Sequence, residues 1–510
     1  MITRIHSAKL HGIKAMDIKV ETSVQSGIGI HMVGLADASV KESLLRTITA
    51  LQATGYYIPG KKIVINLAPT DLYKQGSNYD LPIAVGIISA SGQRDLPDTD
   101  HWLVIGELGL DGSVRTVPGC PQAVLLAKES GLKGCIIPKD NAEEVRAFAD
   151  DLPVYAVSTL DEAVRVLDGS FGIPTVQETP VPENDRNKET SYPAWNCLGN
   201  DAAKRALVIA AAGGHDMLII GPAGSGKSTT VRALAEILPP MTVKERRETA
   251  LVYAAAGRRY DMAPGKRPFR APHYSSSMAA LLGGGAGENV FPGEVSLAHN
   301  GVLFLDEYTL MPKSIKEALR GPIEDKKVII SRLKSRIEYP TSFQLVLASN
   351  PCPCGHYGDG DRCTCTSEQR AAFLSRLSGP VTDHVTLQMW LNPVKTTVGE
   401  SGPTLSEARQ AVINARKRQE ERYQGTGIRT NDALTARDIE KYIRPSDEVK
   451  DIIENLFNHL GLSARSYTRI LKIARTIADL DGADEIATFH VCEAASFRFL
   501  DKKPSEEPID

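Results

Sequence analysis

The sequence predicts an α/β protein built from several domains, and three observations carry that prediction. An apolar run, Met217–Ile220, leads into a glycine-rich loop and then into residues with helical spacing. In the N-terminal block, strand-like and helix-like segments alternate. In the C-terminal region, charged amphipathic segments of helical length follow one another. At 510 residues the chain is long enough for about three domains.

Composition is that of an ordinary globular protein. Apolar residues make up 42% of the chain, charged residues 24%, and the formal net charge is −3. This balance excludes a uniformly basic nucleic-acid coat but leaves room for a local basic lining in a groove or pore. No apolar run approaches the ~20 residues that span a bilayer, and the first residues lack the apolar region of a signal peptide. We therefore expect a cytoplasmic protein with no membrane partner.

Residues 1–174 are expected to form the first domain. Its clearest strands are Ile63–Leu67 and Trp102–Ile105, and its clearest helices are Ala38–Gly55 and Pro121–Gly131. Residues 175–194 are polar and rich in Pro, Glu and Asn, a composition typical of a linker.

A phosphate-binding loop of the form GxxxxGKS follows the strand Met217–Ile220. Its glycines let backbone N–H groups close around phosphate oxygens, and the helix N-terminus adds partial positive charge. Lys227 is placed to reach the β- and γ-phosphates, and the Ser228 hydroxyl to ligate Mg²⁺. The expected nucleotide-binding residues are Gly221, Pro222, Ala223, Gly224, Ser225, Gly226, Lys227, Ser228 and Thr229.

Two further apolar strands end in polar residues. The first, in the stretch Gly301–Glu307, ends in two carboxylates. Asp306 is expected to hold Mg²⁺, and Glu307 is expected to polarise the water that attacks the γ-phosphate. The second, Phe343–Ala348, delivers Asn350, whose amide can contact the γ-phosphate and that water. With the phosphate-binding loop, these motifs predict an AAA+ ATPase core over residues 195–392 that takes ATP and Mg²⁺.

Four cysteines form two close pairs, Cys352-x-Cys354 and Cys363-x-Cys365, in the loop 352–365. Four thiolates can build a tetrahedral Zn²⁺ site. The CxC spacing is tighter than the usual CxxC, so a reduced surface loop, or disulfides formed on oxidation, are the alternatives. A zinc ion here would be structural, because four protein ligands leave no open position, and it would stiffen the loop beside Asn350.

Arg332, Lys334 and Arg336 lie around the tip of an expected hairpin with the arms Val328–Ser331 and Ile337–Tyr339. Cations at alternating positions would share one side of a strand. In a channel they would contact nucleic-acid phosphates without reading sequence. A solvated, charged hairpin is the alternative.

A second linker is expected at residues 393–404, followed by a helical lid domain at 405–500 and a disordered tail at 501–510. The expected lid helices are Leu405–Tyr423, Ser446–Leu460, Ser466–Leu480 and Phe489–Phe499. In AAA+ proteins a lid helix points an arginine back at the γ-phosphate. Arg465 is the preferred residue here and Arg469 the second choice, with an ordinary surface pair as the alternative.

Several longer stretches resemble the magnesium-chelatase-like AAA+ family of the ComM/YifB type. The similarity extends from residue 1 to about residue 500 and rests on Asn66–Pro69, Gly76–Ala84, Gly106–Ser113, Pro268–His273, Pro292–Gly301, Asn350–Gly355 and Leu462–Leu480. It implies that the first domain is a Lon-protease-like α+β domain of the ribosomal S5 domain 2 type. A Lon-type peptidase needs a serine nucleophile and a lysine base. On that pattern these positions fall at Asn78 and near Pro121, so we expect no peptidase activity.

The resemblance also locates the arginine that family members insert into the neighbouring subunit's nucleotide site. This chain has His384 at that position, and Arg376 is the nearest arginine that could replace it. Histidine is mostly neutral at pH 7 and lacks the planar guanidinium fork.

For function, the resemblance implies a homo-hexameric ring ATPase with active sites between subunits. It further implies a branch-migration helicase that acts on single-stranded or branched DNA during natural transformation and recombination. Two alternatives stay open. One is a chelatase-type motor for metal insertion into a tetrapyrrole, and the other is a weakly hydrolysing, nucleotide-gated scaffold, which His384 favours.

Overall fold

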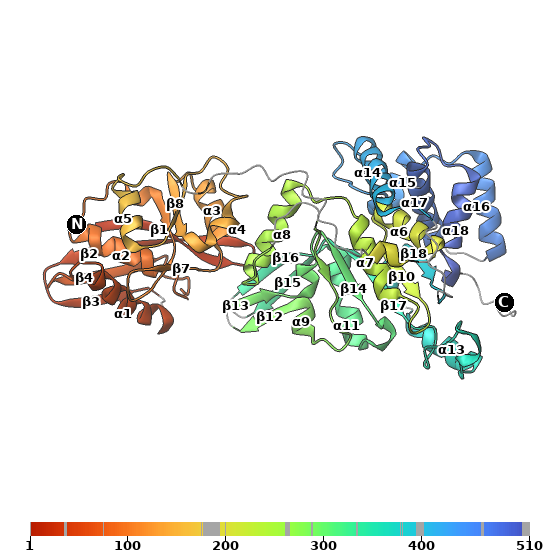
Figure 1. The fold of residues 1–510 in the computed structure, drawn as a ribbon, viewed down its shortest axis with the longest axis horizontal. Helices are drawn as coiled ribbons and strands as arrows, with labels where there is room; N and C mark the ends of the chain where they lie inside the picture. Colours follow the sequence, from red (N-terminus) through yellow and green to blue (C-terminus); the bar gives the residue numbers. More distant parts are fainter. Residues whose placement is uncertain are drawn as a thin grey trace.

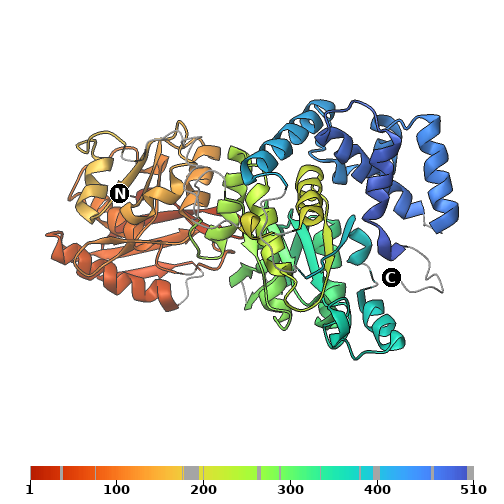
Figure 2. The same cartoon turned by 45° about the vertical axis from the view of Figure 1, so that its right-hand side comes forward.

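Three parts follow one another in space in the order in which they occur in the chain (Figure 1). A mixed sheet with its helices lies at one end, a parallel sheet lies in the middle, and a group of helices lies at the other end, as the turned view in Figure 2 also shows. The structure is a computed structural model. It describes residues 2–34, 38–74, 76–174, 176, 194–198, 200–260, 266–286, 289–332, 335–377, 379, 381–393, 402–460 and 464–501.

The N-terminal part is built on a seven-stranded sheet in the order β3-β4-β2-β1-β5-β8-β9. Strands β1 and β2 are antiparallel and meet at a short turn after His11, whereas β5, β8 and β9 run parallel to one another. Strands β4 and β5 confirm the two strands expected in this part. The bounds are β1 (Ile2–His11), β2 (Lys14–Gln25), β3 (Gly29–Val33), β4 (Lys62–Ala68), β5 (Trp102–Val104), β8 (Gly134–Pro138) and β9 (Val154–Val157), with a separate hairpin of β6 (Glu107–Leu108) and β7 (Val114–Arg115).

Helices cover both faces of this sheet, because successive strand residues point to opposite sides. Val104 and Ile136 pack with α1, α2 and α5, whereas the neighbouring Leu103 and Cys135 pack with α3 and α4. Helix α2 lies so close to β2 that a Cβ on Gly86 would be 2.5 Å from Thr22 Oγ1. The helices are α1 (Ala38–Ala53), α2 (Asp80–Ala90), α3 (Cys120–Glu129), α4 (Ala142–Val145) and α5 (Leu160–Leu167), and α1 and α3 confirm the two that the sequence predicts.

The central part is a five-stranded parallel sheet in the order β11-β14-β17-β10-β18. Strands β10, β14 and β17 are buried along their whole length, which is why they read as continuous apolar runs. Since all five strands run the same way, their carboxyl ends form one edge of the sheet and their amino ends the other. The strands are β10 (Met217–Ile220), β11 (Phe269–Arg270), β14 (Val302–Leu305), β17 (Gln344–Ser349) and β18 (Leu387–Trp390). The helices of this part are α7 (Lys227–Ile237), α8 (Val243–Ala255), α9 (Met278–Leu282), α10 (Glu294–Leu297), α11 (Lys313–Ala318), α12 (Arg320–Glu324) and α13 (Ser367–Leu374).

Two antiparallel hairpins are inserted between the central strands: β12 (Gly283–Ala286) with β13 (Asn289–Pro292), and β15 (Lys327–Arg332) with β16 (Ser335–Pro340). The second hairpin supports the N-terminal part. Ile13, in the turn between β1 and β2, packs in one cluster with Ile337 and Tyr339. A Cβ on Gly12, whose φ is 63°, would lie 2.5 Å from Ile337 Cγ2.

A second contact joins the N-terminal part to α8 of the central part. Gln122 Nε2 donates to the carbonyl of Leu251 over 3.0 Å, and Ala250 is buried in the same hydrophobic cluster as α3. Arg247 donates to Asp150, which also accepts from Lys128 over 2.6 Å. The N-terminal part is therefore docked on the central part through a helix pair and through a hairpin.

The C-terminal helices share the hydrophobic core of the central sheet. Helix α6 (Asp201–Gly213) joins the two, because Ala211 lies in one buried cluster with Ile219, Val412 and Ile473. Arg416 Nη2 donates to the carbonyl of Ala211 over 2.6 Å. The helices are α14 (Leu405–Arg422), α15 (Ala436–Tyr442), α16 (Asp447–Leu460), α17 (Ala464–Leu480) and α18 (Thr488–Ser496), and they confirm the expected helical C-terminal region.

The linker and tail predictions fall largely outside the described residues. Residues 175, 177–193, 394–401 and 502–510 are not described. Asp501, which the sequence placed in a disordered tail, is instead held in the structure: it accepts hydrogen bonds from Arg498 and Ser466. The ordered chain thus extends past residue 500, since these two partners fix its end.

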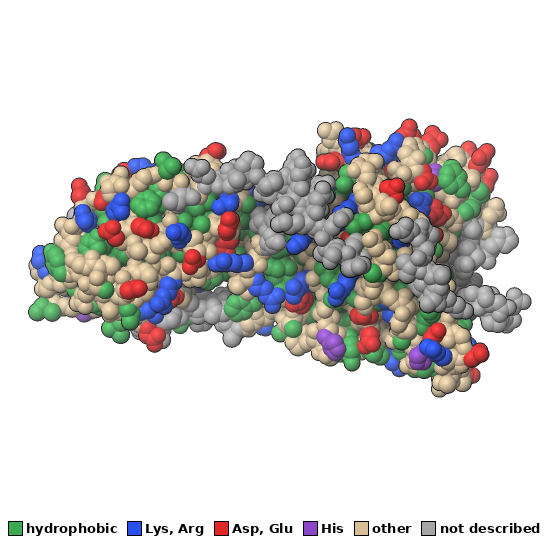
Figure 3. Space-filling model, viewed as in Figure 1, with side chains coloured by type: hydrophobic (Ala, Val, Ile, Leu, Met, Phe, Trp, Pro, Cys, Tyr) green, Lys and Arg blue, Asp and Glu red, His purple; other side chains and the backbone are tan. Residues whose placement is uncertain are grey.

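Charges of both signs lie on the surface of the N-terminal part. On the face in Figure 3, acidic and basic side chains are interspersed over the N-terminal part, in keeping with a net charge of −3. Among the described helices, none combines the length and the apolar character needed to cross a bilayer.

Candidate nucleotide site

The carboxyl end of β10 turns directly into the glycine loop, and α7 begins at Lys227. Gly224 and Gly226 adopt left-handed backbone conformations, with φ of 78° and 88°. At Gly221 the reason for glycine is space, because a Cβ would lie 2.4 Å from the carbonyl oxygen of Leu391. The strand–loop–helix setting that a phosphate-binding loop requires is therefore present.

Lys227 is held at the centre of this loop by three oxygen atoms. Its Nζ donates to the carbonyls of Gly221 and Pro222 over 2.8 and 3.0 Å, and to Asn350 Oδ1 over 3.0 Å. Burial lowers the pKa of Lys227, and the nearby Asp306 and Glu307 oppose that shift. The structure thus brings together the expected phosphate-binding lysine and the expected sensor asparagine from two adjacent strands.

The two carboxylates after β14 lie at the same edge of the sheet. Ser228 Oγ donates to Asp306 Oδ2 over 3.2 Å, so the two residues expected to hold Mg²⁺ are in direct contact. Glu307 has a left-handed backbone, with φ 48°, and its N–H donates to Asp306 Oδ1 over 2.9 Å. Such a conformation is costly for a residue other than glycine, and it turns the chain sharply after the strand.

The cysteine loop contacts the phosphate-binding loop, a contact that sequence reasoning missed. The N–H of Ala223 donates to the carbonyl of Gly355 over 2.8 Å. No pattern in the sequence pointed to it, since it is a backbone hydrogen bond between segments more than a hundred residues apart.

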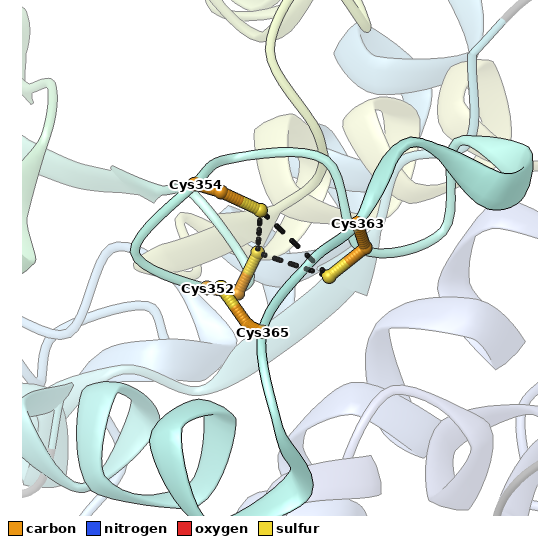
Figure 4. Close-up of side chains that lie close together, drawn as sticks. All are labelled: Cys352, Cys354, Cys363 and Cys365. Carbon is orange, nitrogen blue, oxygen red and sulfur yellow. Dashed lines mark hydrogen bonds between the residues drawn. The ribbon is translucent and has the colours of Figure 1, made fainter.

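The four cysteines converge on one point (Figure 4). Their four Sγ atoms, from Cys352, Cys354, Cys363 and Cys365, all lie within 4.8 Å of one another. Backbone N–H groups donate to Cys354 Sγ and hold the pKa of that thiol below its ordinary value, whereas burial raises the pKa of Cys352. This donor set can hold a metal ion.

The structure does not bring Arg465 to the phosphate-binding loop. Its Nη1 donates to Asp383 Oδ2 over 3.2 Å in a cleft of 820 Å³. The cleft is lined by residues that directly precede the central strands, among them Asp216, Gly301 and Thr386. It therefore lies at the amino edge of the sheet, whereas Lys227 lies at the carboxyl edge. The prediction that Arg465 points at the γ-phosphate bound by its own chain is therefore wrong, because the packing of α17 against α6 carries Arg465 to the amino edge.

His384 and Arg376, the two candidates for the inserted arginine position, lie apart from each other. His384 Nε2 is 3.2 Å from Glu324 Oε1. The His384 side chain lines the same cleft as Arg465 and as Arg469, the second candidate for the lid arginine. Arg376 is exposed beside α11, where its carbonyl accepts from Lys316 Nζ over 3.2 Å. The cleft at the amino edge thus contains Arg465 and Arg469 of α17 together with His384.

The basic hairpin forms as expected, but its cations do not share one face. Ile330 pairs with Ile337, and both are buried on one face of the hairpin. Because alternate residues of a strand share a face, Arg332 lies on that same face and Arg336 lies on the opposite face. The sequence prediction was wrong because it treated the three cations as lying along one strand, whereas the chain reverses between them. Lys334 lies outside the described residues.

In the N-terminal part, the positions that correspond to a peptidase serine and lysine carry no such groups. The Asn78 side chain donates to the carbonyl of Ala8 over 3.4 Å, and Pro121 is buried in the first turn of α3. Ser77 Oγ donates to Glu107.

A phosphate loop on a parallel sheet, with a lysine, an asparagine and a carboxylate pair at the carboxyl edge, defines the chain as a P-loop nucleotide-binding protein. Family models described as magnesium chelatase subunit ChlI match residues 20–141 and 195–398, and a model of the C-terminal part of that subunit matches residues 403–498. The chain is 39% identical over 507 residues to the YifB protein of Escherichia coli K12, covering 98% of this chain and 97% of that one. It is 39% identical over 506 residues to the competence protein ComM of Haemophilus influenzae, covering 97% of each. The chain belongs to this ComM/YifB family of magnesium-chelatase-like AAA+ proteins.

A shorter match links the chain to a protease. It is 29% identical over 150 residues to Lon protease 2 of Bacillus subtilis, covering 29% of this chain and 26% of the protease.

A buried carboxyl at the amino edge predicts a pH dependence of stability. Burial raises the pKa of Asp216 to about 7, an effect that Lys326 and Lys472 oppose and Asp432 reinforces. Because the folded pKa lies above the unfolded value, the folded state favours the protonated carboxyl. The stability that protonation adds is therefore complete below the unfolded pKa of about 4, and it is lost progressively as the pH rises from there through about 7.

We expect Asp216→Asn, which keeps an acceptor for the N–H of Leu345, to remove this dependence. Unfolding followed by urea titration at pH 6 and pH 8 should show about 1 kcal/mol more loss in the wild type than in the variant. Asp484→Asn, at a side chain that is 97% exposed, is the control. Equal pH profiles for the wild type and Asp216→Asn would contradict the assignment.

Proposed function

We propose that the protein is an ATP hydrolase whose copies form a ring, of six subunits, that acts on single-stranded or branched DNA as a branch-migration helicase. The observation that carries the ATPase proposal is the meeting of Lys227, Asn350, Ser228 and Asp306 at one edge of the sheet. The DNA proposal rests on similarity to a competence protein, ComM. A role in natural transformation and recombination is the most specific function that this similarity supports.

The residues at this edge fit Mg·ATP. Ser228 and Asp306 supply the hard oxygen donors that Mg²⁺ prefers, and the ion would neutralise charge on the phosphates. When nucleotide binds, Lys227 would exchange its three protein oxygens for phosphate oxygens. The negative charge of the phosphates would offset the cost of burying the ammonium group. Freed from Lys227, Asn350 is positioned to orient the attacking water. The proposal includes a zinc ion, held by the four cysteines, as a second, structural metal.

Glu307 is the residue that prepares the water. Its carboxylate would accept the water proton as the water oxygen bonds to the γ-phosphorus and the bond to the β–γ bridging oxygen breaks, with ADP as the leaving group. The left-handed backbone at Glu307 lets Asp306 and Glu307 face different partners, one the metal side and the other the water side. Two adjacent carboxylates thereby take separate roles.

The cleft at the amino edge is proposed to meet the nucleotide edge of a neighbouring copy. In the proposed ring, identical copies pack head to tail, and the amino edge of one sheet faces the carboxyl edge of the next. The Arg465 side chain is 76% exposed, so it is available to a neighbouring copy. We place Arg465 and Arg469 in contact with the phosphates of the nucleotide that the neighbouring copy binds. His384 lies in the same cleft, and Arg376 lies outside it.

The N-terminal part is proposed to be a Lon-like α+β domain that has lost peptidase activity. The resemblance of three stretches to the Lon type supports the fold, and these are Asn66–Pro69, Gly76–Ala84 and Gly106–Ser113. Asn78 and Pro121 in place of the nucleophile and base support the loss. Because its β1–β2 turn packs on Ile337, the domain is placed to support the hairpin that carries Arg332 and Arg336.

Replacing Glu307 tests the motor. We expect Glu307→Gln to lower ATP turnover by about 10²- to 10⁴-fold, because the amide cannot accept the water proton, while Mg·ATP binding is retained. Turnover by the wild type, measured by phosphate release, should rise with single-stranded or branched DNA. Glu317→Gln, at an exposed carboxylate of α11, is the matched control.

Each alternative function has its own signature in the same assay. Turnover that DNA leaves unchanged but a tetrapyrrole-binding partner stimulates would replace the helicase with a chelatase-type motor. Tight ATP binding with negligible turnover under all conditions would replace both with a nucleotide-gated scaffold.

Mixed rings test the placement of Arg465. Arg465→Ala and Lys227→Ala chains should each be inactive alone, and mixing them in equal amounts should restore about a quarter of the wild-type sites, because only interfaces that combine two intact halves can turn over. A mixture no more active than its separate components would show that Arg465 acts within its own chain or not at all.

A further inference from the structure

The cysteine cluster has the dimensions of a tetrathiolate metal site. Cys363 Sγ lies 3.8 Å from Cys352 Sγ and 3.7 Å from Cys354 Sγ, and the Cys352–Cys354 distance is 3.3 Å. A tetrahedral zinc ion with Zn–S bonds of about 2.3 Å requires sulfur–sulfur edges of about 3.8 Å. Disulfide-bonded sulfurs would be about 2.05 Å apart. The observed spacing therefore fits four ligands around one ion.

The surroundings of the sulfurs also suit a metal. Backbone N–H groups of His356 and Thr364 donate to Cys354 Sγ, and those of Tyr357 and His356 donate to Cys352 Sγ. Such hydrogen bonds stabilise thiolates and fix their orientation, which is how residues around a metal site support its ligands.

One end of the cysteine loop lies directly on the nucleotide site. The carbonyl of Gly355, the residue after Cys354, accepts the Ala223 N–H of the phosphate-binding loop over 2.8 Å. A Cβ on Gly355 would be 3.7 Å from Ala223 Cβ and 3.8 Å from Asn350 Cγ, so this residue lies beside both the phosphate loop and the asparagine that holds Lys227.

The other side of the loop is anchored by aromatic contacts. Arg370 of α13 lies 4.3 Å from the ring of Tyr357, which packs edge-on against Trp390 at 6.1 Å. Between the two cysteine pairs the chain contains Gly355, Gly358 and Gly360, all with positive φ. Glycines in such conformations lose much entropy on ordering. A cross-link between the cysteine pairs would offset this loss by holding the segment in one conformation.

We propose that the four cysteines bind one Zn²⁺ ion and that this ion holds Gly355 against the phosphate-binding loop, so that ATP binding depends on zinc. The ion is structural, because four protein ligands leave no position for water or substrate. The proposal rests on the proposed nucleotide site, and it adds that zinc controls the shape of that site.

Metal content and nucleotide affinity, measured on the full chain, test this inference. We expect one zinc per chain by elemental analysis of the wild type and of Cys492→Ser, whose exposed cysteine is outside the cluster. Cys363→Ser should lose the ion and bind a fluorescent ATP analogue about tenfold more weakly. Removing zinc from the wild type with a thiol-displacing mercurial and a chelator should weaken binding equally, and added Zn²⁺ after thiol recovery should restore it.

Two results would overturn the proposal. One is a wild-type chain that takes up no zinc from Zn²⁺-containing buffer. The other is a zinc-free chain, whether Cys363→Ser or stripped wild type, that binds the ATP analogue as tightly as the zinc-loaded form. Failure of the motor proposal looks different, since a zinc-loaded chain that binds ATP without hydrolysing it leaves the zinc dependence intact.

Discussion

The contact between Lys227 Nζ and Asn350 Oδ1, 3.0 Å long, is the interaction on which the nucleotide site depends. It needs β10 and β17 to be neighbours, which the order of the parallel sheet provides. It also needs a loop that curls back on itself, which the positive φ at Gly224 and Gly226 provides. The partly buried ammonium group is kept in place by three oxygens, and phosphate oxygens are its stronger partners.

The polarity of the sheet divides the central part into two functional edges. The carboxyl edge holds the phosphate loop, Asp306 and Asn350, as expected where parallel strands end. The amino edge holds a charged cleft that contains Arg465 and His384. Under the proposed function, a single chain presents the two halves of a catalytic site on opposite edges, and a ring of copies joins them.

Much of the site was predictable because its residues follow recognisable strands. Asp306 and Asn350 come directly after strands, Lys227 follows the glycine loop that β10 enters, and parallel strands end together. The position of Arg465 was not predictable, because it depends on how α17 packs against α6. The faces of Arg332 and Arg336 were missed since they depend on where the hairpin turns. The long strands β1 and β2 were also missed, although apolar and polar residues alternate in β2 from Ile18 to Glu21. The bond between Ala223 and Gly355 had no sequence signal.

Calorimetric titration of nucleotides tests the central claim most directly. The account predicts that Lys227→Ala loses at least about tenfold in affinity for Mg·ATP and little in affinity for AMP, which lacks the phosphates that Lys227 would contact. Equal Mg·ATP affinity for the wild type and Lys227→Ala, or no ATP binding by the wild type, would contradict it.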